Sequence, residues 1–455
     1  MHEAAIPREE TGARLEQSAR RRGGPEGISR IPPGRDFELG LTVDPVGTAH
    51  FTGSFAGPVT IGATPFTTLA QQYSLILASV SAAGDPDRAT RIDDGALKDG
   101  LYLPFAASLA IHGSEPDKLI LEGAYHGALA LDPGFTNTGY SDVFLGRVSS
   151  TGPGVDWAHT YGDQNSQLGT SVAVDGNGTI AVAGFFNFAL SLRGSCASIT
   201  TGSQDFDAFV AKFDALGDCQ WVRQIRAPAS RQFGTGVAFD RAGRVALVGT
   251  HQSSVDLGGG LMLADPGESK YNGFVALFDG ADGVAVYASS LGESGENSSV
   301  SVAADALGNV VMGASLQDAK LSYQADVRKI DPPGKTIRER TFGGAGDEGA
   351  ASIDVDDLGR VLLTGYFSGK ATFDGFDLTS EGGTDAFVAV LDGSGAALSV
   401  RQPGGKGNKS GSVIRHIPGG GGAVVLGGFS GELRLGCDSY QSLGGRDLFL
   451  ARFNL

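Results

Sequence analysis

Pairs of acidic side chains are the residues of this chain whose spacing most directly suggests chemistry. Asp205 and Asp207 are two positions apart, as are Asp354 and Asp356, so on a β-strand both carboxylates of a pair share one face. Two such carboxylates can serve glycoside hydrolysis, and they can also bind calcium. Turn capping is the simpler interpretation, because an aspartate recurs at the start of one predicted strand, at Asp142, Asp207, Asp385 and Asp447. We therefore expect no resident cofactor, with calcium as the alternative.

A second group of acids lies in segments that are expected to join successive sheets. The group comprises Asp163, Glu293, Glu296, Asp347 and Glu348. These joining segments share a face with long glycine-rich loops, and loops on a rigid scaffold are where binding residues concentrate. The sequence thus predicts a binding surface on this loop-rich face.

Motifs of metal binding and of covalent catalysis are missing from the sequence. None of the seven histidines has a metal-ligand spacing, and no Gly-x-Ser-x-Gly motif occurs. Gly344–Gly349 matches the Gly-x-Gly-x-x-Gly pattern of dinucleotide sites, but Ala351–Val355 after it is typical of a strand. A dinucleotide site needs a helix there. We therefore predict no metal site and no catalytic residue.

The chain has three cysteines. Cys196 lies in a loop before the third strand of its repeat, and Cys219 lies just before the fourth strand, so a disulfide within one sheet is geometrically feasible. Buried reduced thiols are the alternative. Cys437 has no cysteine at the position of a partner and is expected to be a free thiol.

Glycine is the unusual component of the composition. It accounts for 71 of 455 residues, about twice the usual share of roughly 7%. Collagen is excluded because proline numbers only 18, and a disordered chain is excluded because 41% of residues are hydrophobic. What remains is a globular chain with many turns and therefore many short strands.

The charge balance limits the partners. Lys and Arg number 35 and Asp and Glu number 51, which gives a net charge of -16. Such a field repels nucleic acid and anionic membrane surfaces. The longest apolar stretch, Leu101–Ile111, is too short to span a bilayer. We expect neither nucleic-acid binding nor membrane insertion.

The N-terminal segment differs from the rest of the chain. Residues 1–27 carry five basic and five acidic side chains and lack the apolar core of a secretory signal. We predict a disordered charged tail over 1–27 and a folded domain over 28–455.

An internal repeat accounts for much of the glycine. Thr170–Gly184 and Ala351–Gly365 share a template in which an aspartate is followed by glycine three and nine residues later. The turn aspartates are Asp44, Asp175, Asp240, Asp305 and Asp356, and weaker copies begin near Ser114 and Pro418. The copies number seven and are 51 to 70 residues apart. In Asp-x-x-Gly the aspartate caps a turn and the glycine takes its left-handed position.

A second phrase follows in most copies, as in Asp207–Asp214 and Asp385–Asp392, and a fourth apolar run comes after it. Four short strands per copy predict an all-β fold, a single seven-bladed β-propeller with four antiparallel strands per blade. The last copy lacks its outer strand. We predict that Ile28–Ile31 pairs with Leu448–Phe453 and closes the ring.

The run Ser352–Gly369, followed by Leu378–Ala389, resembles the β-propeller repeat called SBBP. The resemblance covers about residues 28–455 and is strongest in the third, fourth, sixth and seventh copies. It implies a bacterial cell-surface or secreted protein, and it brings no catalytic residues.

These observations predict a non-enzymatic binding or scaffold propeller, monomeric and extracellular or on the cell surface. It would recognise a protein or a glycan through its loop-rich face. The alternative is a polysaccharide hydrolase or lyase that uses carboxylates at the channel mouth. The missing signal sequence conflicts with secretion.

Overall fold

The structure is a computed structural model that describes residues 39–455 with short gaps, together with Ala13–Arg14 and Ile28–Ile31. The gaps are residues 56–58, 62–63, 68–73, 93–104, 114, 132–133, 138, 153, 202–203, 228–229, 259, 266, 268–269, 293–296, 319, 321, 421 and 443–444. The described secondary structure consists of β-strands, which confirms the all-β prediction for this part of the chain. Among the described residues there is no apolar helix of the length that a bilayer requires.

Five four-stranded antiparallel sheets are separate from one another. The first consists of β3 (Gly40–Val43), β4 (Ala49–Phe55), β7 (Ser74–Val80) and β8 (Pro86–Arg91). The second consists of β9 (Phe105–His112), β10 (Glu115–Tyr125), β13 (Asp142–Ser149) and β14 (Val155–Tyr161). The third consists of β15 (Gln167–Val174), β16 (Ile180–Phe186), β19 (Asp207–Phe213) and β20 (Cys219–Ile225). The fourth consists of β21 (Gln232–Phe239), β22 (Val245–His251), β25 (Asn272–Phe278) and β26 (Ala285–Ser290). The last consists of β35 (Lys409–His416), β36 (Ala423–Phe429), β39 (Asp447–Phe453) and β2 (Ile28–Ile31).

The fifth and sixth repeats form one eight-stranded sheet. Its strands are β27 (Ser298–Ala304), β28 (Val310–Gln317), β29 (Tyr323–Ile330), β30 (Thr336–Gly344), β31 (Glu348–Val355), β32 (Val361–Phe373), β33 (Phe376–Leu391) and β34 (Ala397–Arg401). The joint is the pairing of β30 with β32, in which Gly343 lies opposite Thr372 and Gly344 opposite Ala371. A Cβ on Gly344 would lie 1.8 Å from the carbonyl oxygen of Lys370, so only glycine allows this approach.

The prediction of a seven-bladed propeller with four antiparallel strands per blade is therefore wrong, because the described chain has five such blades. The two long strands of the sixth repeat, β32 and β33, pair with each other beyond the blade, and the extended part of β32 pairs with β30. The backbone of β2 pairs antiparallel with β39, from Ile28 opposite Ala451 to Ile31 opposite Leu448. This pairing does not establish closure of a seven-bladed ring, because the described chain does not have seven four-stranded blades.

Short hairpins and one small sheet extend from the main sheets. The hairpins are β11 (Ala128–Leu129) with β12 (Phe135–Thr136), β17 (Ala189–Leu190) with β18 (Ile199–Thr200), β23 (Val255–Asp256) with β24 (Met262–Leu263), and β37 (Glu432–Leu435) with β38 (Asp438–Gln441). The small sheet consists of β1 (Ala13–Arg14), β5 (Val59–Ile61) and β6 (Thr64–Phe66).

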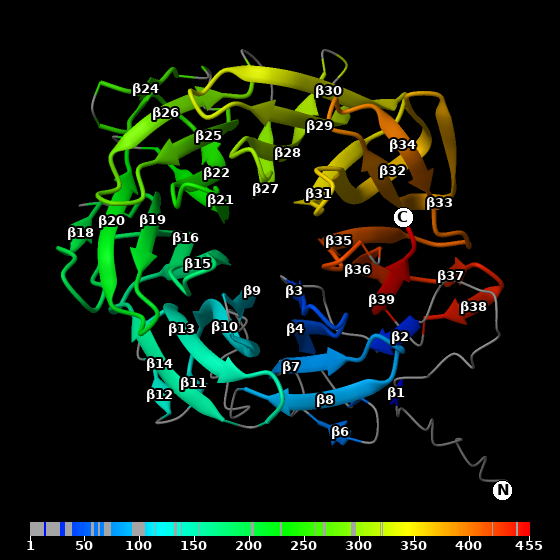
Figure 1. Cartoon of the computed structure of the whole chain (residues 1–455), viewed down its shortest axis with the longest axis horizontal. Coiled ribbons are helices and arrows are strands. Elements are labelled where there is room, and N and C mark those ends of the chain that lie inside the picture. The colour runs from blue at the N-terminus through cyan, green and yellow to red at the C-terminus, as the bar shows by residue number, and fades with distance from the viewer. Residues whose placement is uncertain are drawn as a thin grey trace, which may run out of the picture.

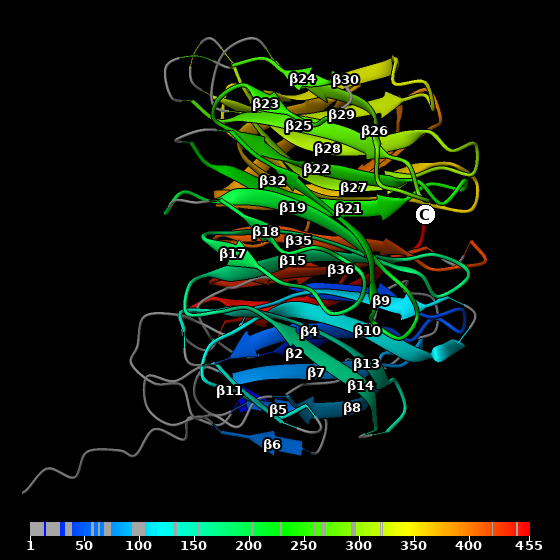
Figure 2. The ribbon, with the colours of Figure 1, turned by 90° about the vertical axis from the view of Figure 1, so that its left-hand side faces the viewer.

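The sheets stand around a central axis with their first strands innermost (Figure 1). Around the circle, each innermost strand contacts the next, in the order β3, β9, β15, β21, β27, β31, β35 and back to β3. Figure 2 shows that the strands run from one face of the ring to the other. This arrangement is a β-propeller, as the sequence predicts.

The turn between the first and second strands has one geometry in five repeats. In the fourth repeat, Oδ1 of Asp240 accepts hydrogen bonds from the amides of Ala242 and Arg244, both at 2.9 Å, and Gly243 has a φ of +77°. The same two bonds recur at Asp44, Asp175, Asp305 and Asp356. A left-handed φ explains the first glycine of the repeat.

The second glycine has a different cause. A Cβ on Gly184 would lie 2.7 Å from the ring of Phe209 and 2.1 Å from the carbonyl oxygen of Leu168. Gly249 lies against Phe274 in the same way, and both rings are fully buried. The glycine nine residues after the turn aspartate is therefore required by close packing between strands.

Hydrophobic clusters lie between neighbouring sheets and hold the ring together. One cluster joins Val210 of the third sheet to Val237 and Leu247 of the fourth, and all three are buried. The aspartate turns mark one face of the ring, which we call the turn face. Segments 162–166, 345–347 and 402–408 join successive repeats on the other face, which we call the loop face.

Candidate functional site

A cavity of about 520 Å³ lies inside the circle of first strands. Several hydroxyl side chains line its wall together with apolar ones: Ser108, Thr170, Ser171, Thr235, Thr250, Ser301, Ser352 and Ser412. Phe185 and Phe233 are its aromatic lining residues, and Arg415 is the charged one. The described wall contains no carboxylate. This central cavity is the principal candidate for a ligand site.

Bulges in the first strands bring these hydroxyl groups to the cavity. The register shifts between Gly169 and Ser171 in β15 and between Ala350 and Ser352 in β31, and comparable shifts occur in β21, β27 and β35. A bulge bends its strand and redirects a side chain. Thr170, the extra residue of β15, donates to the carbonyl oxygen of Gly234 at 2.8 Å.

Serine hydroxyls also connect neighbouring first strands. Ser171 Oγ accepts the Val237 amide at 3.1 Å, and Ser301 Oγ accepts the Ile353 amide at 3.2 Å. These bonds join strands of different repeats, so the cavity wall is held together by the same side chains that line it.

Arg415 is fixed beside the cavity by its neighbours. Its Nη1 donates to Ser352 Oγ at 3.3 Å and to the carbonyl oxygen of Ile414 at 2.7 Å. Nearby, Asp354 Oδ2 accepts the His416 amide at 2.7 Å and contacts His416 Nδ1 at 2.8 Å.

Asp354 and His416 titrate as partners. Burial alone would raise the pKa of Asp354, but its hydrogen bond with His416 and the nearby charges of His416 and Arg415 hold that pKa below the ordinary value. Burial alone would lower the pKa of His416, but Asp354 and Asp357 raise it above the ordinary value. The pair is thus stabilised as a charged one.

Four aromatic rings gather beside the loop-face end of the cavity. Phe185 meets Phe206 and Phe233 edge-to-face, with ring centroids 5.4 and 4.8 Å apart, and Phe233 lies 6.0 Å from Tyr271. All four rings are half-buried. Aromatic rings arranged this way present both faces and edges to a ligand.

A second cavity, of about 630 Å³, lies on the turn face between the turns of the third, fourth and fifth repeats. The carboxylates of Asp240 and Asp305 at its edge form ion pairs with neighbouring side chains. Asp240 Oδ2 forms an ion pair with Arg244 at 2.6 Å, and Asp305 Oδ2 forms one with Lys329 at 2.8 Å. This cavity has no free acid–base pair at Asp240 or Asp305.

The acids predicted for the loop face do not form one cluster. Asp163 lies before β15, while Asp347 and Glu348 lie at β31, and β21 and β27 stand between those strands. Asp163 Oδ1 accepts the Asn165 amide and Gln167 Nε2, both at 2.8 Å. Glu293 and Glu296 lie outside the described residues.

The carboxylates of Asp347 and Glu348 also accept hydrogen bonds from nearby backbone amides. Asp347 Oδ1 accepts the Tyr323 amide at 3.1 Å. Glu348 is fully buried, its Oε2 accepts the Gly344 amide at 3.0 Å, and burial raises the pKa of its carboxyl. The segment from Gly344 to Gly349 connects two strands, so it has no helix to bind a dinucleotide.

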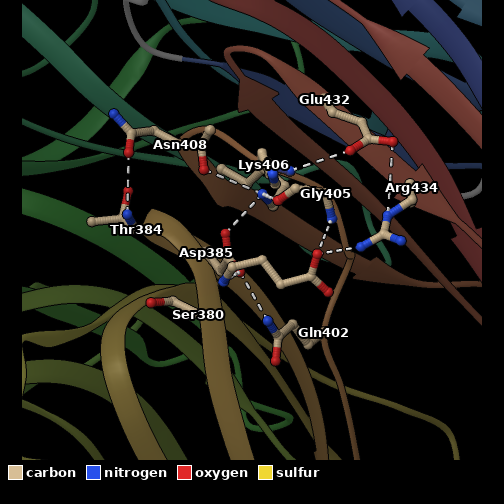
Figure 3. Close-up of polar contacts among 12 residues, drawn as sticks. Ser380, Thr384, Asp385, Gln402, Gly405, Lys406, Asn408, Glu432 and Arg434 are labelled. Atoms are coloured by element: carbon tan, nitrogen blue, oxygen red, sulfur yellow. Dashed lines mark hydrogen bonds and ion pairs between the residues drawn. The ribbon is translucent and has the colours of Figure 1, made fainter.

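An ion pair at the loop face joins the sixth and seventh repeats (Figure 3). Lys409 Nζ lies 2.8 Å from Asp385 Oδ1, and both side chains are completely buried. Lys409 also donates to the carbonyl oxygen of Gly405, and Asp385 Oδ2 accepts the Glu381 amide and Gln402 Nε2, both at 2.8 Å. Glu381 and Arg434 form an exposed ion pair beside them.

Related polar pairs recur at two other junctions. Asn297 Nδ2 donates to Asn272 Oδ1 at 3.4 Å, and Gln324 Nε2 donates to Glu348 Oε2 at 3.2 Å. These junction pairs were not predicted from the sequence. Its signal is a polar residue eight positions before each turn aspartate, at Gln167, Gln232, Asn297 and Glu348.

The recurring aspartates of the third strands differ in burial, because Asp207 and Asp447 are buried and Asp142 is half-buried. Asp142 and Asp207 stand where Asp385 stands in its own repeat. Burial raises the pKa of each carboxyl to about 6, against the lowering effect of hydrogen bonds from Asn137 and Gln224, respectively. Each amide partner lies in the same repeat as its carboxyl, so these contacts belong to a single blade.

Cys196 and Cys219 form a disulfide with a Cα–Cα distance of 5.7 Å, and Cys437 is an exposed free cysteine. In the part of the chain that the structure covers, no group of three or more His, Cys, Asp or Glu side chains is arranged to hold a metal ion.

No protein-family model and no curated protein matches the chain. Among solved structures, it is similar to a PL25 polysaccharide lyase described as an ulvan lyase, with 10% identity, a TM-score of 0.48, and coverage of 88% of this chain and 91% of that one. It is also similar to an α-L-arabinanase of Penicillium chrysogenum, with 10% identity, a TM-score of 0.42, and coverage of 93% and 96%. A third similar structure is the Hadza microbial sialidase Hz136, with 11% identity, a TM-score of 0.41, and coverage of 87% and 75%. The assignment as a propeller rests on the strand arrangement itself.

Proposed function

We propose that this chain is a non-enzymatic binding or scaffold propeller that recognises a protein or a glycan on its loop face, where the central cavity has its aromatic rings. One observation carries the proposal. The described loop-face acids are held by local hydrogen bonds, whereas the cavity wall offers hydroxyl groups, aromatic rings and one guanidinium. Such a wall suits binding, because pockets for ligands combine apolar surface with a few directed polar groups.

The alternative, a polysaccharide hydrolase or lyase, requires two carboxylates about 5–9 Å apart facing one pocket. Asp142, Asp207 and Glu348 have the raised pKa of a general acid, but Asp207 and Glu348 are almost completely buried, and none of the three lines the central cavity. The described wall of the central cavity has no carboxylate to pair with them. The geometry therefore favours binding over hydrolysis.

We further propose that the repeats are of the SBBP type and that the protein is extracellular or on the cell surface. The recurring aspartate turn and the buried phenylalanine of the third strand support the repeat type. The Cys196–Cys219 disulfide supports the location, because disulfides persist in oxidising compartments.

The test is a binding screen of the full chain against a glycan array, with matched variants on the two faces. Tyr271→Ala removes a loop-face ring, and Leu307→Ala removes a side chain that is 81% exposed on the turn face. We expect Tyr271→Ala to weaken binding at least fivefold and Leu307→Ala to leave it unchanged. The reverse result would contradict the loop-face proposal. Release of reducing ends or unsaturated products from a polysaccharide panel would favour the enzymatic alternative.

A further inference from the structure

The wall of the central cavity offers hydrogen-bond donors in excess. The hydroxyls of Ser171 and Ser301 each accept a backbone amide from the next first strand. Because a serine hydroxyl has a single proton, which an accepted bond does not use, each can still donate to a ligand. Ser352 Oγ accepts from Arg415 and retains its own proton in the same way.

Arg415 adds a charged donor to this wall. Its Nη1 is used by Ser352 and Ile414, while its Nε and Nη2 have no hydrogen-bond partner among the described residues. A guanidinium with a free Nε–Nη2 edge matches the two oxygens of a carboxylate.

Asp354, the acid that interacts with Arg415, uses both of its oxygens in other contacts. Asp354 interacts with Arg415 electrostatically, but its Oδ1 accepts the Val355 amide at 2.9 Å and its Oδ2 is occupied by His416. No other acid belongs to the described cavity wall. The donors therefore select a ligand group that only accepts hydrogen bonds, such as a carboxylate.

The opposite side of the cavity suits a sugar ring. Phe185 and Phe233 line it from β16 and β21, and these strands lie across the ring from β35 (Figure 1), the strand to which Arg415 belongs. An aromatic ring packs against the apolar face of a pyranose, and the hydroxyl-rich wall matches the sugar hydroxyls. A volume of about 520 Å³ is within the usual range of small-ligand sites.

We propose that the central cavity binds an acidic sugar, a pyranose that carries a carboxylate. The carboxylate binds the Nε–Nη2 edge of Arg415 with help from Ser352, and the sugar ring packs on the side of Phe233. This inference rests on the proposed binding function and specifies its ligand class.

Isothermal titration calorimetry of the full chain tests the proposal with glucuronate and galacturonate, their neutral counterparts glucose and galactose, and acetate. We expect at least one uronate to bind at least tenfold more tightly than its neutral counterpart and than acetate. Equal affinity for a uronate and its neutral counterpart would overturn the proposal, as would binding of acetate as tight as that of the uronates.

Arg415→Met should reduce uronate affinity at least tenfold and leave neutral-sugar affinity within twofold. Arg338→Met is the matched control, because Arg338 also donates from Nη1 to the preceding carbonyl at 2.7 Å but lies exposed on β30. Unchanged uronate binding by Arg415→Met would refute the assignment. If circular dichroism shows that this variant does not fold, Arg415→Lys replaces it and should weaken uronate binding while keeping the preference for the acid.

Absence of uronate binding at millimolar concentration also overturns this inference. It does not decide the proposed function, because the array experiment with Tyr271→Ala and Leu307→Ala tests loop-face recognition independently. Binding of a neutral glycan there, without uronate binding here, would retain the propeller as a binding module and exclude Arg415 as its ligand contact.

Discussion

Replacing Lys409 with methionine should reveal how strongly the last repeat is attached to its neighbour. Lys409 Nζ lies 2.8 Å from Asp385 Oδ1, and neither side chain is exposed. The substitution leaves Asp385 as a buried charge that keeps the Glu381 amide and Gln402 as donors. Removing one member of a buried ion pair typically costs about 3–5 kcal/mol. We expect a loss of this size, because the Gly405 carbonyl also loses its donor.

The assay is urea unfolding followed by far-ultraviolet circular dichroism at pH 7, with the midpoint compared at an unchanged m-value. Lys409→Gln is the informative control, because Gln167 and Gln232 occupy the equivalent position in other repeats. It retains a donor and should cost about half as much as Lys409→Met. The double variant Lys409→Met/Asp385→Leu should recover most of the loss, because no unpaired charge remains.

A loss below about 1 kcal/mol in Lys409→Met would refute this reasoning, since a destabilisation that small is expected of an exposed pair. Failure of the double variant to recover stability would show that packing around Lys409, and not the charge of Asp385, sets the cost.

Three further perturbations have definite expected outcomes. Asp207→Asn should raise the melting temperature at pH 8 and change it little at pH 4. The folded state favours the protonated Asp207 carboxyl, whose pKa is about 6, so the stability that this carboxyl contributes is lost as pH rises through 6. An equal gain at both pH values would contradict this. Reduction of the Cys196–Cys219 disulfide, whose sequence separation is 23, should lower the free energy of unfolding by about 3 kcal/mol in urea titrations with and without reductant, and an unchanged midpoint would exclude a stabilising role. Gly184→Ala should lower the melting temperature by several degrees, since its Cβ would lie 2.1 Å from a carbonyl oxygen, whereas Gly176→Ala, with open space around it, should not; similar melting temperatures for the two variants would count against the packing explanation.

Local features of the fold could be predicted from the sequence because they depend on residues close in the chain. The Asp-x-x-Gly turn needs only one side-chain oxygen and one left-handed residue, so its position follows from two letters. The strands follow from apolar runs between such turns. Repetition of the unit then implies a propeller, because each unit must cover its apolar faces with its neighbours.

The candidate site was less predictable. The sequence analysis chose exposed-looking loop acids, but Glu348 is fully buried and Asp163 accepts hydrogen bonds from its own loop. Arg415 could not be predicted as a site residue from the repeat, because the equivalent residues of the third and fourth repeats are alanines, Ala173 and Ala238. Its role depends on which strand faces the cavity, and a single strand's pattern does not contain that information.

By itself, the sequence determined that this protein is all-β, that its strands are joined by aspartate turns, and that the repeats form a propeller. Only the tertiary structure decided that the fifth and sixth repeats share one sheet, through Gly343 and Gly344 opposite β32. It also decided that hydroxyls and Arg415 meet around one cavity. The physical reason is range: turns and strands follow from neighbours in the chain, whereas sheet joints and cavities depend on contacts between residues tens or hundreds of positions apart.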